Sequence, residues 1–294
     1  MLANRTLLRT PYAVVASLVL LAAGAQPALP TNPPDSISEM GTSYETWVST
    51  DAGPLRDEQL LKLSSSQQPT SITLPGLPAD ADIDAFEYLG PDHYYFSLAD
   101  WAVLPGGLHV HPADIVEWNG ANYFKVFDVL ACGYSAGLNV DAIDLNPGFP
   151  TLVLLVSFDT MFGYVSGHGI VRVFDEDFVA LEPNTCAFGA VTQLAGSERR
   201  WDLDGLASVS QWDSPLDLVD FVSYDTWVIA GGVLGSPGSV VGYRGGQWSA
   251  PAFNVKGARP TAEIDAIWIV PSPVGELFRD DYETGATDRW SATH

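Results

Sequence analysis

Positive charge is scarce in this chain of 294 residues. Lys and Arg together number 13, against 36 Asp and Glu, and the formal net charge is −23 at pH 7. Proteins that bind nucleic acid or anionic membrane surfaces need clusters of Lys and Arg to meet the phosphates. The composition therefore argues against both kinds of partner. It suits an exported protein, including one that meets divalent cations.

Long apolar runs are also scarce, and the clearest one lies at the start of the chain. Arg5 and Arg9 precede an apolar run over residues 12–23, and Ala23-Gly24-Ala25 then supplies small residues of the kind a signal peptidase reads. The run is shorter than the roughly 20 residues that a membrane span needs. We expect a signal peptide over residues 1–25, no membrane span in the mature chain, and a bacterial protein that is secreted, periplasmic or on the cell surface.

Cysteine is limited to Cys132 and Cys186. In an oxidising compartment an even pair is typical of one disulfide, whereas two buried free thiols are the alternative. The export signal favours the bond.

Helical periodicity is almost absent. Residues 26–42 carry four prolines and read as a linker, whereas residues 43–271 consist of short apolar or alternating runs bounded by Gly, Pro, Asp and Asn. This pattern predicts an all-β domain over 43–271, followed by a tail over 272–294.

A pattern of apolar, Asp, small and apolar residues occurs four times. The Asp residues are separated by 57, 63 and 61 residues, which indicates a repeat of about sixty residues. The four copies are Ile83-Asp84-Ala85-Phe86, Val140-Asp141-Ala142-Ile143, Leu203-Asp204-Gly205-Leu206 and Ile264-Asp265-Ala266-Ile267.

Each unit contains four strand-like pieces, and the second pieces are expected at 94–98, 152–158 and 225–230. The fourth unit lacks its last three strands, but residues 43–48 match residues 223–228 of the third unit almost residue for residue. The N-terminal segment therefore supplies three strands, and the C-terminal strand supplies the one they lack. This predicts a four-bladed β-propeller of four-stranded repeats, closed by that pairing. An open or two-sheet stack of the same hairpins is the alternative.

The inner-strand motif, followed by the aromatic Tyr94-Tyr95-Phe96, resembles a hemopexin-type repeat. That resemblance implies a four-bladed layout. The units are also similar to repeats of uncharacterised secreted bacterial proteins.

The tail resembles a terminal segment of many exported bacterial proteins, of the type Asp-Gly-Phe-Glu-Ser-Gly-Asp-Thr-Ser-Ala-Trp-Ser. This resemblance implies sorting or surface association, and packing of Phe278 and Trp290 on the propeller is the alternative. The matching residues are Asp280, Glu283, Gly285, Thr287, Trp290 and Ser291.

The four repeated Asp residues would meet near one axis. Close carboxylates repel unless a cation or N–H donors neutralise them. Two hypotheses stay open: an axial metal site, with calcium as the candidate cofactor, and a structural clasp in which each Asp accepts N–H bonds from a neighbouring blade. The residues are Asp84, Asp141, Asp204 and Asp265.

Other motifs are weaker. Gly133-x-Ser135-x-Gly137 matches a nucleophile elbow, but a strand follows at once where a helix is required, so we interpret it as a turn. His109-Val110-His111 would form half of a metal site. Four of the nine Trp lie near expected loops or strand ends, where they either bind a glycan or protein or fill gaps between blades. They are Trp101, Trp118, Trp212 and Trp248.

The sequence marks no acid–base pair and no nucleophile with its base. We therefore expect a monomeric, exported, non-enzymatic binding or scaffolding module for an extracellular protein or glycan. The alternative is a secreted hydrolase or lyase that acts on a polysaccharide through carboxylates at the channel mouth, such as Asp100, Asp159 and Asp177.

Overall fold

The computed structural model describes most of the chain from residue 37 to residue 271. The described residues are 37–43, 48–50, 53–55, 59–64, 69–90, 92–145, 152–166, 169–194, 201–211, 214–225, 227–230, 232–237, 239–244, 246–254, 264 and 266–271. The expected signal peptide, most of the linker and the C-terminal tail lie outside them. Within them, no helix is long and apolar enough to cross a bilayer.

The described residues form an all-β fold with one turn of 3-10 helix, η1 (Pro183–Thr185). Four antiparallel four-stranded sheets carry the architecture. In their hydrogen-bonded order they are β24 (Ala266–Pro271), β1 (Ile37–Ser43), β4 (Gln59–Ser64) and β5 (Pro69–Thr73); β6 (Ile83–Gly90), β7 (His93–Leu98), β10 (Ile115–Trp118) and β11 (Tyr123–Phe127); β12 (Val140–Leu145), β13 (Leu154–Phe158), β16 (Asp177–Glu182) and β17 (Ala187–Gln193); and β18 (Gly205–Gln211), β19 (Ser214–Ser223), β22 (Ser239–Arg244) and β23 (Gln247–Asn254).

A two-stranded hairpin is inserted between the second and third strands of each sheet. These hairpins were not expected from the sequence, because strands of three to five residues leave too short an alternation to recognise. They are β2 (Val48–Thr50) with β3 (Gly53–Leu55), β8 (Ala102–Leu104) with β9 (Leu108–Val110), β14 (Phe162–Ser166) with β15 (Gly169–Val173), and β20 (Val228–Ala230) with β21 (Val233–Gly235).

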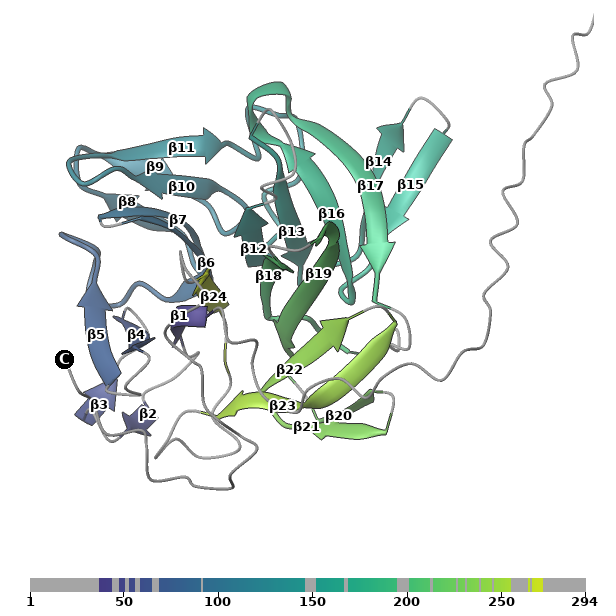
Figure 1. Cartoon of the computed structure of the whole chain (residues 1–294). Helices are drawn as coiled ribbons and strands as arrows, with labels where there is room; N and C mark the ends of the chain where they lie inside the picture. Colours follow the sequence, from purple (N-terminus) through teal and green to yellow (C-terminus); the bar gives the residue numbers. More distant parts are fainter. Residues whose placement is uncertain are drawn as a thin grey trace, which may run out of the picture.

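The first strands of the four repeats lie together in the middle of the molecule, with the sheets around them (Figure 1). β6 contacts β12 and β24, and β18 contacts the same two strands. The central strands are apolar and small, so both of their faces can be buried, and along β12 the five residues from Val140 to Asp144 are all buried. The repeated Asp motif therefore predicted the central strands correctly.

Apolar clusters fill the space between neighbouring sheets. Phe127, Val156 and Phe158 belong to one cluster, Phe86 and Phe96 to a second, and Trp201 with Leu206 and Tyr224 to a third. Each cluster combines residues from different sheets, so apolar side chains hold neighbouring sheets together.

Two strand predictions need correction. The second strand of the third repeat is β19, not residues 225–230, because the segment that repeats residues 43–48 starts at the last residue of β19 and ends in hairpin strand β20. For the same reason the first strand of the N-terminal segment is β1. It begins at Ile37, inside the range expected to be linker.

The C-terminal strand pairs with the N-terminal segment, as predicted. β24 and β1 form an antiparallel ladder from Ile37 opposite Pro271 to Ser43 opposite Ala266. β1 also pairs with β4, so this sheet is built from both ends of the described chain.

Cys132 and Cys186 form a disulfide, which favours an exported protein because such bonds persist in oxidising compartments. Cys132 follows β11, and Cys186 ends η1 in the next repeat. The hydroxyl of Tyr134 donates a hydrogen bond to the carbonyl of Cys186 at 3.1 Å. The disulfide therefore joins two consecutive repeats.

We expect reduction of this disulfide, or the Cys132→Ser/Cys186→Ser variant, to lower the free energy of unfolding by about 4 kcal/mol, because the bond closes a long loop in the unfolded chain. The separation of the two cysteines is 54 residues. Chemical denaturation followed by Trp fluorescence, with and without reductant, would measure this loss. An unchanged denaturation midpoint would contradict it.

Candidate functional site

The central strands begin at the end of the molecule from which the hairpins emerge. In three repeats, the residue just before the repeated Asp donates its backbone N–H to a carbonyl that lies between the hairpin and the third strand of the preceding repeat. These bonds are Val140 N–H to Pro112 O (3.2 Å), Leu203 N–H to Asp175 O (3.3 Å) and Ile264 N–H to Pro237 O (3.2 Å). Backbone bonds therefore link consecutive repeats beside the Asp residues.

A serine lies opposite the small residue that follows each repeated Asp. In two repeats its buried Oγ donates to the next repeat: Ser97 to the carbonyl of Val140 at 2.6 Å, and Ser157 to that of Leu203 at 3.0 Å. The sequence contained this signal, because the serines recur at one register position. The pairs are Ala85 with Ser97, Ala142 with Ser157, Gly205 with Ser223, and Ala266 with Ser43.

Gly205 departs from the alanine of the other copies for a steric reason. A Cβ atom on Gly205 would collide with the Oγ of Ser223 and would lie 3.3 Å from the backbone nitrogen of Ile267 on β24. An alanine here would therefore clash with Ser223 on the adjacent strand of the same sheet and would lie close to β24.

The fold brings three of the four predicted Asp residues together. Burial raises the pKa of Asp141 well above its usual range, and the charges of Asp202, Asp84 and Asp204 raise it further, against a hydrogen bond from Ser157 that lowers it. The Oγ of Ser157 donates to Asp141 Oδ1 at 2.6 Å. Asp265 lies outside the described residues.

Asp84 also has a raised pKa. Burial raises its pKa to about 8; the side-chain amide of Asn139 opposes this shift, and the charges of Asp82, Asp159 and Asp202 add to it. At neutral pH, Asp84 is therefore mainly a neutral carboxylic acid. This explains how several carboxyl groups can share one end of the molecule.

Sequence reasoning missed a second layer of polar residues, two positions before each repeated Asp. Burial raises the pKa of Asp202 to about 7, with further contributions from Asp225, Asp175 and Asp159. The signal was present, because each copy of the motif has an acid or amide two residues earlier. They are Asp82, Asn139, Asp202 and Glu263.

Further along the central strands lies another buried carboxyl pair, Glu87 on β6 and Asp144 on β12. Burial raises both pKa values, that of Asp144 to about 7, and the charge of Asp144 contributes to the shift of Glu87. Asp144 Oδ1 accepts the backbone N–H of Ser208 on β18 at 3.1 Å, and Ser208 Oγ donates to Asp220 at 2.8 Å. Here a carboxylate does clasp the next repeat, three residues after the predicted position.

Among the described residues, no group of three or more His, Cys, Asp or Glu side chains has an arrangement that could hold a metal ion. In the described part of the cluster, raised pKa values favour protonated carboxyl groups, and the Ser157 hydroxyl and the Asn139 side-chain amide donate hydrogen bonds to Asp141 and Asp84. With Asp265 outside the described residues, the four-carboxylate calcium site stays a prediction.

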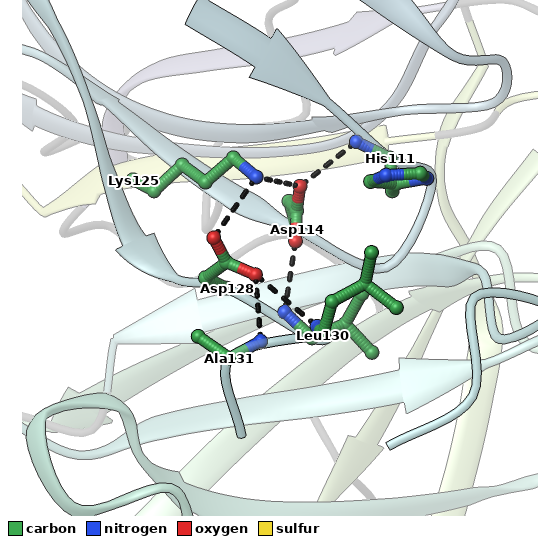
Figure 2. Close-up of polar contacts among 7 residues, drawn as sticks. His111, Asp114, Lys125, Asp128, Leu130 and Ala131 are labelled. Atoms are coloured by element: carbon green, nitrogen blue, oxygen red, sulfur yellow. Dashed lines mark hydrogen bonds and ion pairs between the residues drawn. The ribbon is translucent and has the colours of Figure 1, made fainter. Parts of the chain in front are cut away.

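The third-strand entry of the first repeat holds a buried ion pair (Figure 2). Asp114 is fully buried and lies 2.7 Å from Lys125 Nζ; its two oxygens accept the backbone N–H groups of His111 and Val129, both at 2.8 Å. Lys125 also contacts Asp128 at 3.1 Å. Because Asp114 is committed to these donors, it is not available to complete a metal site with the neighbouring histidines.

The other candidate residues from the sequence are Ser135 and the tryptophans, and most of those that the structure describes have structural roles. Ser135 lies in a turn, where its Oγ accepts the N–H of Gly137 at 3.1 Å. Trp118 is buried against Tyr123, with ring centroids 4.6 Å apart, and Trp248 is half-buried beside Tyr243. These two tryptophans fill the core, whereas Trp101 is exposed and lies beside the ring of His109. Trp212 lies outside the described residues.

The predicted hydrolase carboxylates do not form one group. Asp177 is buried and accepts the N–H of Phe174 at 3.1 Å, whereas Asp100 and Asp159 are exposed before hairpins β8–β9 and β14–β15. Asp100 and Asp159 share their end of the molecule with a set of exposed apolar side chains. We call this end the hairpin face and define its apolar set as Trp101, Val103, Met161, Val165, Ile170, Trp227, Ile229 and Leu234.

Comparison with known proteins identifies no family: no family model matches the chain, and no curated protein matches it. Similar solved structures include a protein of unknown function from Bacteroides caccae (8% identity, 80% of this chain and 99% of that chain, TM-score 0.33). They also include a hemopexin-fold protein from cow pea (10% identity, 75% and 94%, TM-score 0.36). A third is the Neurospora crassa Pan2 WD40 domain (10% identity, 72% and 52%, TM-score 0.28). These likenesses are too distant to carry an argument about arrangement or function, so the function must be inferred from this chain's own residues.

Proposed function

We propose that this protein is an exported, non-enzymatic binding or scaffolding module, built as a closed four-bladed, hemopexin-like propeller. The observation that carries this function is the hairpin face, where hairpins β8–β9, β14–β15 and β20–β21 expose large apolar side chains to solvent. Apolar residues clustered on the surface of a soluble protein mark an interaction site. The disulfide supports the exported location.

Closure of the ring is supported by two observations that involve both chain ends. β24 pairs with β1, and it also contacts β6 and β18, the central strands on either side of it. The first strands of the four repeats thus contact one another around one centre, as the inner strands of a closed ring would.

The enzymatic alternative would need an accessible acid–base pair. The interacting carboxyl groups Glu87 and Asp144 do not supply one, because both are buried between central strands. A general acid and base must lie within hydrogen-bond reach of a substrate. We therefore favour binding over hydrolysis.

The test is capture of a partner by the purified exported protein. Immobilised protein is exposed to proteins secreted by the source cells and to a glycan array, and a panel of glycosidase and esterase substrates is run in parallel. We expect specific retention of a protein or glycan without turnover. Robust hydrolysis of any substrate in the panel would overturn the proposal.

A cation at the repeated Asp residues is a second, separate proposal. Asp84 Oδ2 and Asp141 Oδ2 are buried and accept no hydrogen bond from the described residues. Either a proton or a cation stabilises such an oxygen. If calcium binds at Asp84, Asp141, Asp204 and Asp265, the melting temperature should rise with calcium and fall with chelator. The same midpoint in both would remove the cation.

A further inference from the structure

Hairpins β8–β9, β14–β15 and β20–β21, of the first three repeats, expose apolar side chains where a sheet normally exposes polar ones. Their strands alternate, with one side packed on the protein and the other in water, as Leu104 and Tyr164 are buried while Val103 and Val165 are exposed. Solvent-facing positions of such strands are usually polar. In this protein Val103, Val165, Ile170, Ile229 and Leu234 occupy such positions, beside the polar His109 and Arg172.

These exposed side chains form pairs across the hairpins. Val165 lies opposite Ile170, and Ile229 lies opposite Leu234. Their exposed fractions are 83% and 78% in the first pair and 67% and 55% in the second. Each pair therefore presents two neighbouring apolar side chains to solvent, a feature that marks interaction sites when such side chains gather on a surface.

A large side chain also stands at the base of each of these hairpins. Trp101, Met161 and Trp227 directly precede β8, β14 and β20, and all three are exposed. Trp101, Met161 and Trp227 occupy equivalent positions in their repeats. In each repeat, the residue two positions earlier donates its backbone N–H to the backbone carbonyl of the polar residue that lies two positions before the repeated Asp. Those bonds are Ala99 to Asp82 (3.0 Å), Asp159 to Asn139 (3.3 Å) and Asp225 to Asp202 (3.3 Å).

Exposed carboxylates accompany these apolar side chains. Asp100 adjoins Trp101, Asp159 lies two residues before Met161, and Asp225 lies two residues before Trp227. Arg172 is exposed on β15 beside this set, so the named acids still outnumber the base. The charge of the whole chain, −23, has the same sign.

We propose that the hairpin face binds a cationic, amphipathic segment of another exported protein, with its apolar side chains on the exposed hairpin pairs and its Lys or Arg side chains on Asp100, Asp159 and Asp225. This inference rests on the proposed binding function and names its partner class. Apolar anchors surrounded by complementary charge give both affinity and steering.

The chemistry of the face disfavours two other occupants. Sugars are held by flat aromatic rings and convergent polar groups, whereas the most exposed residues here are aliphatic. A second copy of this chain would bring two acidic faces together, which costs energy at ordinary ionic strength.

The probe for this proposal is a short synthetic peptide of alternating Leu and Lys, whose binding to the full exported protein is measured by fluorescence anisotropy. We expect saturable binding that weakens as salt rises. A Ser-Lys peptide of equal charge and a Leu-Glu peptide of equal apolarity should each bind at least about tenfold more weakly, because anchor and charge are both required.

Variants then locate the site. Val165→Ser/Ile170→Ser and Ile229→Ser/Leu234→Ser should each weaken Leu-Lys binding about tenfold. Asp100→Asn/Asp159→Asn should reduce its salt dependence. Matched controls are Phe124→Ser, an exposed apolar residue on β11, and Asp92→Asn, an exposed acid in the β6–β7 turn; neither should change binding. The thermal midpoint of each variant checks its fold.

Four outcomes would overturn the inference. They are equal binding of the Leu-Lys and Ser-Lys peptides, equal losses from Phe124→Ser and the hairpin variants, glycan binding that depends on Trp101 and Trp227, and concentration-dependent self-association that the hairpin variants abolish. If the wild-type protein captures a secreted partner and the hairpin variants still bind it, the proposed binding function stands but the assignment of the binding site to the hairpin face is wrong. If the wild-type protein captures nothing and the peptide does not bind, both fail.

Discussion

A chain that ends at residue 262 should not fold, whereas a chain that ends at Pro271 should fold as stably as the full protein. The shorter chain lacks β24 and with it the buried side chains of Ile264, Ala266 and Ile267. Burying one large aliphatic side chain stabilises a protein by about 1.5–3 kcal/mol. The total free energy of unfolding of a domain is only about 5–15 kcal/mol.

The loss exceeds these side chains, because β24 is central. Without it, β1 loses one of its two ladder partners, and the apolar faces of β6 and β18 that contact β24 become exposed. Circular dichroism and thermal melting of the two truncations, made side by side, would measure the difference. A cooperative melt and a compact elution volume for the chain ending at residue 262 would contradict the closed ring. Unfolding of the chain ending at Pro271 would instead show that the tail over 272–294 belongs to the fold.

Stability should fall as pH rises from about 5 to about 8.5, the reverse of ordinary carboxylate behaviour. The folded-state pKa is about 8 for Asp84 and about 7 for both Asp144 and Asp202, chiefly because these groups are buried. In the unfolded chain an Asp has a pKa of about 3.9. Between these values the native state binds more protons than the unfolded state, so the free energy of unfolding decreases with pH.

The contribution of these three groups to the free energy of unfolding is therefore fully present below about pH 4. It is lost as the pH rises through their folded-state pKa values of about 7 and about 8. Each unit of pKa shift corresponds to about 1.4 kcal/mol, so together the buried groups account for several kcal/mol. Asp84→Asn removes one titrating group and preserves its shape. It should raise the melting temperature at pH 8.5, leave it nearly unchanged at pH 5, and flatten the pH dependence.

The matched control is Asp80→Asn, an exposed acid in the turn before β6, which should leave the pH profile as it is. Differential scanning calorimetry at several pH values gives both the midpoints and the slopes. A wild-type midpoint that rises from pH 5 to pH 8.5 would show that Asp84 is ionised in the folded state. A bound cation would then have to neutralise the charge of Asp84, and melting curves with calcium and with chelator would test for that cation.

The central strands and the disulfide could be predicted from the sequence because each depends on few residues. An Asp between an apolar and a small residue, repeated every sixty residues, fixes one strand per repeat. The second strand of the third repeat was wrong because the most similar segments, 43–48 and 223–228, cross the boundary between a long strand and a short hairpin. The similarity correctly identifies equivalent positions in the two repeats, but these positions do not coincide with a single strand.

The candidate site was predictable in part. The repeated Asp residues were expected to lie close together, and Asp84, Asp141 and Asp204 do so. Their partners Asn139, Ser157 and Asp202 come from other strands and other repeats, so their roles depend on packing that no local pattern contains. The exposed side chains of the hairpin face were hidden for a similar reason, since an apolar residue in a short strand looks like core until its surroundings are known.

The antiparallel pairing of β1 with β24 also determines how the protein responds to mechanical force. Ile37 lies opposite Pro271, so the N-terminal end of β1 and the C-terminal end of β24 lie at the same end of this ladder. Tension between the two termini would therefore pull the strands apart like a zipper, loading one backbone pair at a time instead of shearing the ladder all at once. A protein held at one terminus bears no such load. Tethered at both ends, it would open first at its closing strand and then lose the support of its centre.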